Sequence, residues 1–273
     1  MRVGLAQLTS TTDPATNLRL VREWTERAVA DGADLVVFPE ATMMSYAGSS
    51  RRAAEPVDGP WSRAVIDLAA ELDTTIAVGT VTLPDGDRPG GRVHNTLLVT
   101  GPHGTTRYHK IHLYDAFGHT ESDTIAPGTE PAEVLELAGL PTGVSVCYDL
   151  RFPELYKWYA ARGAEVQLVV ASWGDGPGKL DQWRHLVRAR ALDTTCWVVA
   201  CGQADPASQG ADRVESGPPL GVGHSMVVDP LGRVVAEANA GPQLLVADLD
   251  RTTVAEARAV LPVLANTRLT PPE

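Results

Sequence analysis

The sequence predicts an α/β fold in which two similar halves pack together as one layered sandwich. Apolar strands alternate with amphipathic helices along most of the 273 residues, which is typical of helices that cover the faces of a β-sheet. In addition, a helix followed by Gly32-Ala33-Asp34 and an apolar strand is echoed by a helix followed by Gly163-Ala164-Glu165 and a second apolar strand. Shared turn chemistry is the alternative explanation of so short a repeat.

The composition is that of a globular protein, with 44% hydrophobic and 21% charged residues. We expect a single domain over residues 1–273, in which the last ten or so residues form a tail. The net charge of -11 argues against nucleic acid or an anionic membrane as a partner, because phosphate binding requires a basic face. The sequence contains no apolar run near the roughly 18 residues that span a bilayer.

The first half is expected to begin with a strand over residues 2–8 and a helix. Asp13 as N-cap and Pro14 at the first helical position predict where the helix begins, and Gly32 predicts where it ends. The apolar run that follows is typical of a strand buried on both faces, and it ends at the carboxylate of Glu40. The remaining elements of this half are a helix and three strands, at about 60–72, 74–83, 92–100 and 104–109.

The second half is organised around the stretch from Gly143 to Leu155. An apolar strand delivers Cys147 at the point where the strand must stop, and Pro153 falls in the first turn of a helix. Cys147 is therefore expected in a strand-to-helix elbow beside free N–H groups, a setting that can lower a thiol pKa and hold an oxyanion. The alternative is a small, inert core residue. Strands at about 165–171, 196–202, 223–229, 232–237 and 243–249 and helices at about 179–195 and 251–260 complete the half.

Four chemically capable residues fall where strands end or irregular segments begin: Glu40, Lys110, Glu121 and Cys147. Hydrolysis of an amide by a thiol requires a base for the thiol proton and a donor for the tetrahedral oxyanion. Glu40 can be the base, Lys110 the cation, and the backbone N–H of Tyr148 a second donor. Taken singly, however, a glutamate or lysine is more often a solvated surface charge. The separations along the chain are also too large for spacing to show proximity.

Three ordered blocks of the chain resemble the nitrilase superfamily, the carbon–nitrogen hydrolases. Val36 to Glu40 resembles the first catalytic block, Tyr108 to Asp115 the lysine block, and Gly143 to Glu154 the nucleophile block. The order glutamate, lysine, cysteine is that of the family, and the similarity extends over nearly the whole chain, including residues 183–193 and 223–230.

The resemblance implies a four-layer α-β-β-α sandwich, a homodimer or larger assembly that pairs across helical faces, and no cofactor. It implies Glu40, Lys110 and Cys147 as catalytic residues, the N–H of Tyr148 as an oxyanion donor, and Glu121 as the second glutamate that positions substrate and lysine. The implied reaction is hydrolysis of a small amide to an acid and ammonia through a cysteine thioester.

Within the family, the segment from Cys147 to Glu154 is most similar to the amidase branch that contains omega-amidase and deaminated glutathione amidase, which act on small carboxylated amides. Two segments depart from the common pattern. Gln182-Trp183-Arg184 stands where the family often has His-Trp-Glu, and Ser172-Trp173-Gly174-Asp175 differs from the usual Ala-Phe version. We expect both near the substrate entrance, so the substrate stays open. An N-carbamoyl amino acid amidohydrolase or a nitrilase would use the same site. A non-catalytic binding protein of this fold is the alternative from another class, and it predicts loss of at least one of the three catalytic residues.

Four further residues have open roles. By family position, Tyr46 and Trp173 are candidates for the substrate pocket, with simple packing as the alternative. Asp149 and Arg151 either contact substrate or form a salt bridge that locks the elbow.

No metal site is expected. Cys196 and Cys201 lie on opposite faces of an apolar strand, which suits the core better than a shared metal. His109 and His112 flank the lysine without an evident third ligand. The sequence contains three cysteines and shows no secretory leader, which predicts a reduced, cytoplasmic protein.

Overall fold

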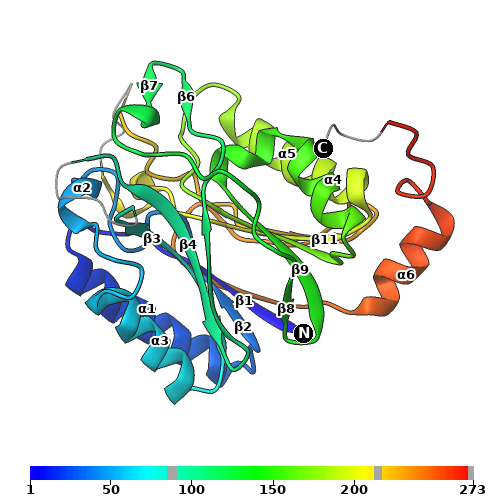
Figure 1. Ribbon diagram of the computed structural model, residues 1–273, viewed down its shortest axis with the longest axis horizontal. Helices are drawn as coiled ribbons and strands as arrows, with labels where there is room; N and C mark the ends of the chain where they lie inside the picture. Colours follow the sequence, from blue (N-terminus) through cyan, green and yellow to red (C-terminus); the bar gives the residue numbers. More distant parts are fainter. Residues whose placement is uncertain (85–90, 212–216, 270–273) are drawn as a thin grey trace.

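The computed structural model describes residues 1–84, 91–211 and 217–269. Two six-stranded sheets face each other, and helices cover the outer face of each sheet (Figure 1). This arrangement is the four-layer α-β-β-α sandwich that the family resemblance implies.

The first sheet has the strand order β14-β1-β2-β3-β4-β5. Helices α1 (Pro14–Ala30) and α3 (Pro60–Glu71) pack together on its outer face (Figure 1). Its strands are β1 (Arg2–Gln7), β2 (Leu35–Val37), β3 (Thr75–Thr82), β4 (His94–Gly101), β5 (Gly104–His109) and β14 (Gln243–Asp248).

The second sheet has the strand order β13-β12-β11-β10-β9-β8. Helices α4 (Pro153–Ala161) and α5 (Lys179–Thr194) lie on its outer face (Figure 1). Its strands are β8 (Leu135–Leu137), β9 (Leu140–Val146), β10 (Val166–Ala171), β11 (Trp197–Gly202), β12 (Met226–Val228) and β13 (Val234–Glu237).

Helix α1 shows how the sequence pattern builds a layer. The Asp13 side chain accepts hydrogen bonds from two backbone N–H groups of the first turn, as its predicted role as N-cap requires. Val21, Trp24 and Ala28 form its buried face and belong to the apolar cluster between α1, α3 and the first sheet. Burial of this stripe, rather than helix propensity, supplies most of the stabilisation of such a helix.

The parallel strands at the centre of each sheet determine where a site can form. β1, β2 and β3 run parallel, as do β9, β10 and β11. The carboxyl ends of parallel strands meet at one edge of a sheet, where open α/β folds bind their ligands. Glu40 follows β2, Cys147 follows β9, and Ser172 follows β10. Side chains from both halves can therefore meet between the two sheets.

Several elements differ from the sequence predictions. The strand expected at 243–249 is β14, which leaves the second half and pairs antiparallel with β1 in the first sheet. The irregular segments contain short elements whose few residues give no measurable periodicity. These are α2 (Ser50–Ala53), β6 (Asp115–Ala116), β7 (His119–Thr120), η1 (Glu121–Asp123), β8, η2 (Cys147–Arg151) and η3 (Pro206–Gln209).

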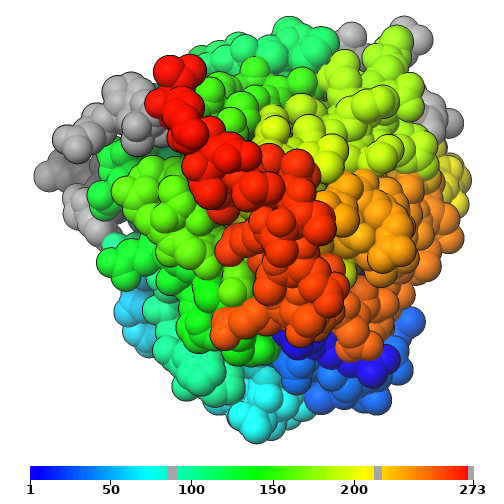
Figure 2. Space-filling model, turned by 90° about the vertical axis from the view of Figure 1, so that its right-hand side faces the viewer, coloured from blue at the N-terminus to red at the C-terminus, as the bar shows by residue number. Residues whose placement is uncertain are grey.

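The C-terminal helix α6 (Arg251–Val260) packs at one end of the sandwich and lies on the surface (Figures 1 and 2). Arg251 Nε donates to Glu165 at 2.8 Å, and Arg258 Nη2 donates to the Ala164 carbonyl oxygen at 2.8 Å. The predicted tail falls partly on residues 270–273, outside the described residues. Within the described ranges, none of the helices has the length and hydropathy needed to cross a bilayer.

Candidate active site

Glu40 is placed by the end of β2 and by a close approach to β3. Ala41, the next residue, has a left-handed backbone conformation with a φ of 60°. A Cβ atom at Gly79 of β3 would lie 2.6 Å from the Pro39 carbonyl oxygen and 2.7 Å from the Glu40 Cα. Because side chains do not approach backbone atoms so closely, only glycine allows the turn that carries Glu40 to pack on β3.

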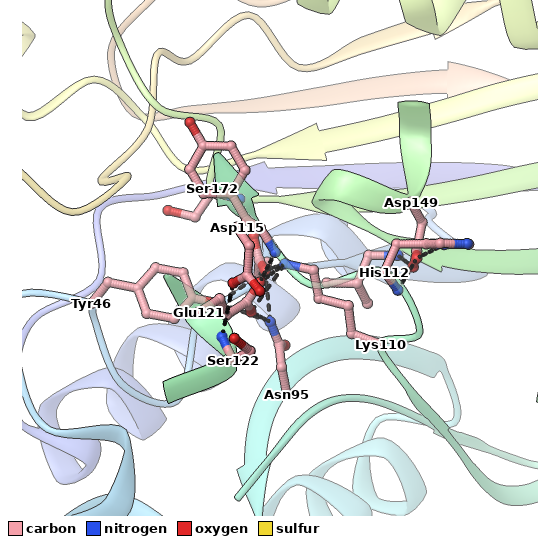
Figure 3. A network of polar contacts seen from close by, with 12 residues as sticks. Tyr46, Asn95, Lys110, His112, Asp115, Glu121, Ser122, Asp149 and Ser172 are labelled. Atoms are coloured by element: carbon pink, nitrogen blue, oxygen red, sulfur yellow. Dashed lines mark hydrogen bonds and ion pairs between the residues drawn. The ribbon is translucent and has the colours of Figure 1, made fainter. Parts of the chain in front are cut away.

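The Glu40 carboxylate is 1% exposed and accepts four hydrogen bonds. Figure 3 shows the polar network to which its donors Tyr46, Asn95 and Lys110 belong. Tyr46 Oη, Asn95 Nδ2 and Lys110 Nζ donate to Oε1 from 2.9, 2.7 and 3.0 Å. The backbone N–H of Ser172, in the second half of the chain, donates to Oε2 from 2.7 Å. Donors from both halves therefore fix the position of this carboxylate.

Lys110 follows β5 and lies between two carboxylates. Its Nζ is 3.0 Å from Glu40 Oε1 and 2.8 Å from Glu121 Oε2, and its side chain is 2% exposed. Burial alone would lower the pKa of Lys110, but the charges of Glu121 and Glu40 outweigh burial and raise this pKa well above the ordinary lysine value. Lys110 is therefore a fixed ammonium ion that can stabilise negative charge but has no capacity to accept a proton.

Glu121 begins η1 and closes the hairpin of β6 and β7. The backbone N–H of Tyr114 donates to Glu121 Oε2 at 2.6 Å, and the N–H of Glu121 donates to the Tyr114 carbonyl oxygen at 3.3 Å. These two hydrogen bonds close the base of the hairpin at Glu121, the residue that holds Lys110. We refer to Glu40, Lys110 and Glu121 as the acid–lysine cluster.

Asn95 in β4 belongs to the same network, and the sequence analysis missed it. Its Nδ2 lies 2.7 Å from Glu40 Oε1, 2.8 Å from Tyr46 Oη and 3.2 Å from Glu121 Oε1. The amide therefore connects the two glutamates. The signal that could have identified it is asparagine within a strand, where this residue type is depleted.

Cys147 follows β9 and begins η2, with a φ of 47° that is uncommon for a residue other than glycine. Its side chain is 7% exposed. Burial, and then the charge of Glu40, raise the pKa of the Cys147 thiol well above its ordinary value, although Lys110 acts in the opposite direction. These effects outweigh the lowering expected from an elbow. The thiol is therefore protonated at neutral pH, and a nucleophile forms only when a base removes the proton.

Tyr148 follows in the first turn of η2. The first backbone N–H groups of a helix lack a partner within the helix. The use of the Tyr148 N–H as a hydrogen-bond donor to an oxyanion stays a prediction.

Asp149 joins the lysine segment to the elbow and is fully buried. It accepts hydrogen bonds from Tyr108 Oη at 2.8 Å and from the Val146 N–H at 2.9 Å. The His112 N–H donates to it at 3.0 Å, and the His112 Nδ1 lies 2.7 Å away. Neither role expected of Asp149 is observed: it does not line the pocket, and in the described structure its carboxylate contacts the His112 side chain and not Arg151. Its acceptor capacity is used by the backbone and side chains that hold the elbow.

One pocket, with about 370 Å³ of unfilled space, contains the acid–lysine cluster and Cys147. This volume suits a small molecule. Tyr46 and Trp173 also line it. The Tyr46 hydroxyl donates to Glu40, and the Trp173 ring packs 5.5 Å from the ring of Trp183.

Arg151 and Lys179, which we call the cation pair, line the same pocket. Arg151 Nη2 donates to Gln182 Oε1 at 2.7 Å, and its guanidinium carbon is 4.9 Å from the Trp173 ring centroid. Lys179 Nζ donates to Tyr114 Oη at 3.0 Å. Among the described residues neither cation has a carboxylate partner.

Cys196, Cys201 and His109 do not line this pocket, whereas His119 does. Cys196 and Cys201 are fully buried, and Cys201 Sγ is 3.2 Å from the Val37 carbonyl oxygen of the opposite sheet. His109 stacks on His94 with ring centroids 4.2 Å apart. The described residues contain no group of three or more side chains suited to hold a metal ion.

Comparison with known proteins identifies the family of the chain. The model of the carbon-nitrogen hydrolase family matches residues 2–259. The chain belongs to the carbon–nitrogen hydrolase family. It is therefore an enzyme of the amidohydrolase type, and the non-catalytic alternative is set aside.

This hydrolase is 53% identical over 272 residues to Hydrolase Rv0480c of Mycobacterium tuberculosis, covering 97% of this chain and 95% of the relative. It is 34% identical over 277 residues to the deaminated glutathione amidase of Escherichia coli O157:H7, covering 100% and 99%.

Two solved structures show the same fold. Saccharomyces cerevisiae Nit3, a member of branch 10 of the nitrilase superfamily, aligns with a TM-score of 0.81 and 28% identity over 96% of this chain and 94% of that one. A mutant of the amidase from Nesterenkonia sp. AN1, with acrylamide added at its active-site cysteine, aligns with a TM-score of 0.75 and 26% identity over 96% and 98%.

Proposed function

We propose that this hydrolase cleaves a small, carboxylated amide to an acid and ammonia through a thioester on Cys147. The observation that carries the proposal is the position of a buried thiol beside Glu40 and Lys110 in a single pocket. The related Nesterenkonia amidase, whose active-site cysteine took up acrylamide, supports the choice of nucleophile.

The first half of the reaction forms the thioester. Glu40 removes the proton of the Cys147 thiol, and the thiolate attacks the amide carbon. The oxyanion receives hydrogen bonds from Lys110 Nζ and the Tyr148 N–H. The C–N bond then breaks, and the departing ammonia takes the proton from Glu40. Because the Lys110 ammonium is fixed between Glu40 and Glu121, it supplies charge to the oxyanion without exchanging a proton.

The second half releases the acid. A water molecule gives a proton to Glu40 and attacks the thioester carbon, after which the C–S bond breaks and Glu40 returns the proton to the thiolate. One amide and one water thus yield one acid and one ammonia. Glu40 acts as base and as acid in turn, a role that requires its position against both the thiol and Lys110.

The carboxylate of the substrate is assigned from charge. Arg151 lines the pocket, and its buried Nε lacks a hydrogen-bond partner among the described residues. A buried donor of this kind favours an anionic ligand. Hydrolysis of N-carbamoyl amino acids or nitriles remains the second candidate, since both pass through the same thiol chemistry.

The test measures release of ammonia or amine from 2-oxoglutaramate, deaminated glutathione, an N-carbamoyl amino acid and a simple nitrile. We expect release from a carboxylated amide by the parent and a fall of at least about 10³-fold in Cys147→Ala, the scale seen when a nucleophile is removed. Circular dichroism and the melting temperature check that the variant is folded. Release that persists in Cys147→Ala contradicts the proposed mechanism.

The family resemblance adds a homodimer or larger assembly, and the three free cysteines favour a cytoplasmic location. Leu192 in α5 and Leu231 are 42% and 50% exposed, and they offer apolar surface on the helical side of the second sheet. Light scattering after size-exclusion chromatography tests the assembly; a monomer at micromolar concentration contradicts it.

A further inference from the structure

We propose that Lys179 determines substrate specificity by binding, together with Arg151, the carboxylate of a monoanionic amide. This inference rests on the proposed hydrolysis and deepens it, because it names the residue that separates anionic from neutral substrates.

The surroundings of Lys179 are apolar and aromatic. Its Nζ lies 3.8 Å from the centroid of Phe117, 5.1 Å from that of Tyr114 and 5.7 Å from that of Trp173, and the residue is 7% exposed. Aromatic faces offset part of the cost of burying an ammonium ion, but they accept none of its hydrogen bonds in the way a carboxylate does. Tyr114 Oη is its one hydrogen-bond acceptor among the described residues. Two of the three N–H donors of Lys179 therefore remain available to a ligand.

Arg151 approaches the same ring as Lys179. The Trp173 centroid is 4.9 Å from the Arg151 guanidinium carbon and 5.7 Å from Lys179 Nζ, so both cations flank one indole. Burial, and then the charge of Arg151, lower the pKa of Lys179. A carboxylate placed between the two cations would relieve both effects and would satisfy the buried Nε of Arg151.

The charges of the pocket specify how many negative charges the ligand carries. Among the carboxylates, lysines and arginines of the described residues that line the pocket, Glu40 and Glu121 face the three cations Lys110, Arg151 and Lys179. With the thiol protonated, one positive charge is left. A monoanion neutralises it, whereas a neutral amide leaves it buried and a dianion exceeds it. Because uncompensated charge is costly in a desolvated site, the pocket favours the monoanion.

The two segments that depart from the family pattern both lead to the cation pair. Trp173, in the first segment, lies against both cations, and Gln182, in the second, accepts from Arg151. Lys179 lies between the two segments at the start of α5. The sequence differences that leave the substrate open are therefore the ones that build this part of the pocket.

The first experiment compares matched amides that differ in one terminal group: glutaramate with pentanamide, and succinamate with butanamide. We expect the parent to favour the anionic member in kcat/KM. Lys179→Met should lower this preference by about 10- to 100-fold, mainly through KM, as expected for loss of a hydrogen bond to a charged group. Lys179→Arg should retain most of the preference. Lys157→Met removes an exposed lysine of α4 and should change nothing. No preference in the parent, or an equal loss for both members in Lys179→Met, overturns the proposal.

The second experiment uses binding and so does not depend on turnover. Calorimetry with Cys147→Ala should show tighter binding of glutaramate than of pentanamide. Adding Lys179→Met should weaken glutaramate binding by about 10- to 100-fold and leave pentanamide binding unchanged. If the parent releases no ammonia but this difference appears, the hydrolysis proposal fails and the role of Lys179 stands. Glutaramate binding that is unaffected by Lys179→Met overturns the role of Lys179.

Discussion

The acid–lysine cluster and the cation pair lie in one pocket but treat charge in opposite ways. In the cluster, Lys110 Nζ is within 3.1 Å of three carboxylate oxygens from two glutamates. In the cation pair, neither Arg151 nor Lys179 has an acidic partner among the described residues. The charge of Lys110 is neutralised within the protein, whereas the charges of Arg151 and Lys179 are neutralised by the proposed ligand.

This difference indicates that the acid–lysine cluster carries out the reaction, whereas the cation pair selects the substrate. Lys110, which must remain an ammonium ion, is held by the two glutamates, and their charges raise the Lys110 pKa despite burial. Arg151 and Lys179, which select the substrate, keep N–H donors without partners in the part of the protein that the structure describes. These unpaired donors cost free energy in the empty pocket, and substrate binding offsets that cost. Changes in the cluster should therefore affect all substrates alike, and changes near the cation pair should affect anionic substrates alone.

The largest loss of activity is expected from Glu40→Gln, a change in the acid–lysine cluster. Hydrolysis of both anionic and neutral amides should fall by about 10²- to 10⁴-fold because the base is lost. The thiol should respond in the opposite direction. The negative charge of Glu40 raises the Cys147 pKa, so its removal lowers this pKa and increases the thiolate fraction at neutral pH. The rate of alkylation by iodoacetamide as a function of pH should show a midpoint at lower pH than in the parent.

Cys147→Ala is the control for this alkylation, because it identifies the labelled thiol among the three cysteines. A midpoint that moves to higher pH in Glu40→Gln would contradict the electrostatic account of the thiol. Hydrolysis that survives would exclude Glu40 as the base.

A smaller effect is expected from Gly79→Ala. The new Cβ would meet backbone atoms of Pro39 and Glu40 at 2.6 and 2.7 Å, so the turn that carries the carboxylate must move. We expect kcat to fall by about 10- to 100-fold for both members of an amide pair, since small displacements of catalytic groups have effects of this size. The free energy of unfolding should fall by about 1–3 kcal/mol in urea titrations.

Gly202→Ala in β11 is the matched control, since the nearest atoms to its Cβ would be at 3.4 and 4.0 Å. It should change both quantities less than Gly79→Ala does. A loss confined to the anionic amide would mean that Gly79 serves selection instead of chemistry.

The smallest loss of activity is expected from Gln182→Ala, a change beside the cation pair. Removal of the acceptor 2.7 Å from Arg151 Nη2 loosens the guanidinium without moving the cluster. The KM for glutaramate should rise by about 2- to 10-fold, while the kinetics of pentanamide stay the same. Gln209→Ala, an exposed glutamine bound to Thr9, is the control. An equal rise in KM for both amides would show that Gln182 acts on the whole pocket.

The fold was predictable where physical patterns are long. The N-cap Asp13 and the apolar stripe of α1 predicted that helix, and the uninterrupted apolar run before Glu40 predicted a buried strand. The place of β14 was not predictable, because its short apolar run is equally compatible with either sheet and its partner β1 is far away in the sequence. Short elements such as η2 were missed because they are fixed by tertiary contacts, for example those of Asp149.

In the candidate site, too, local features were predictable and contacts between distant segments were not. The strand-end positions of Glu40 and Cys147 follow from local sequence, but their approach to Lys110 and Glu121 came only from the resemblance to a family. Asn95 was missed because its function depends on two carboxylates that arrive from other segments. The sequence showed the departures at 172–175 and 182–184, but their convergence on Arg151 and Lys179 required the structure.

The pairing of β1 with β14 has a consequence for synthesis on the ribosome. Until Gln243–Asp248 has emerged, β1 is an edge strand whose backbone N–H and C=O groups are open to any other extended chain. The hydrogen bonds between Met1 and Leu249 form later still. The nascent chain therefore has an unpaired strand edge from the synthesis of β1 until the synthesis of β14, and termination before β14 would leave that edge without its partner.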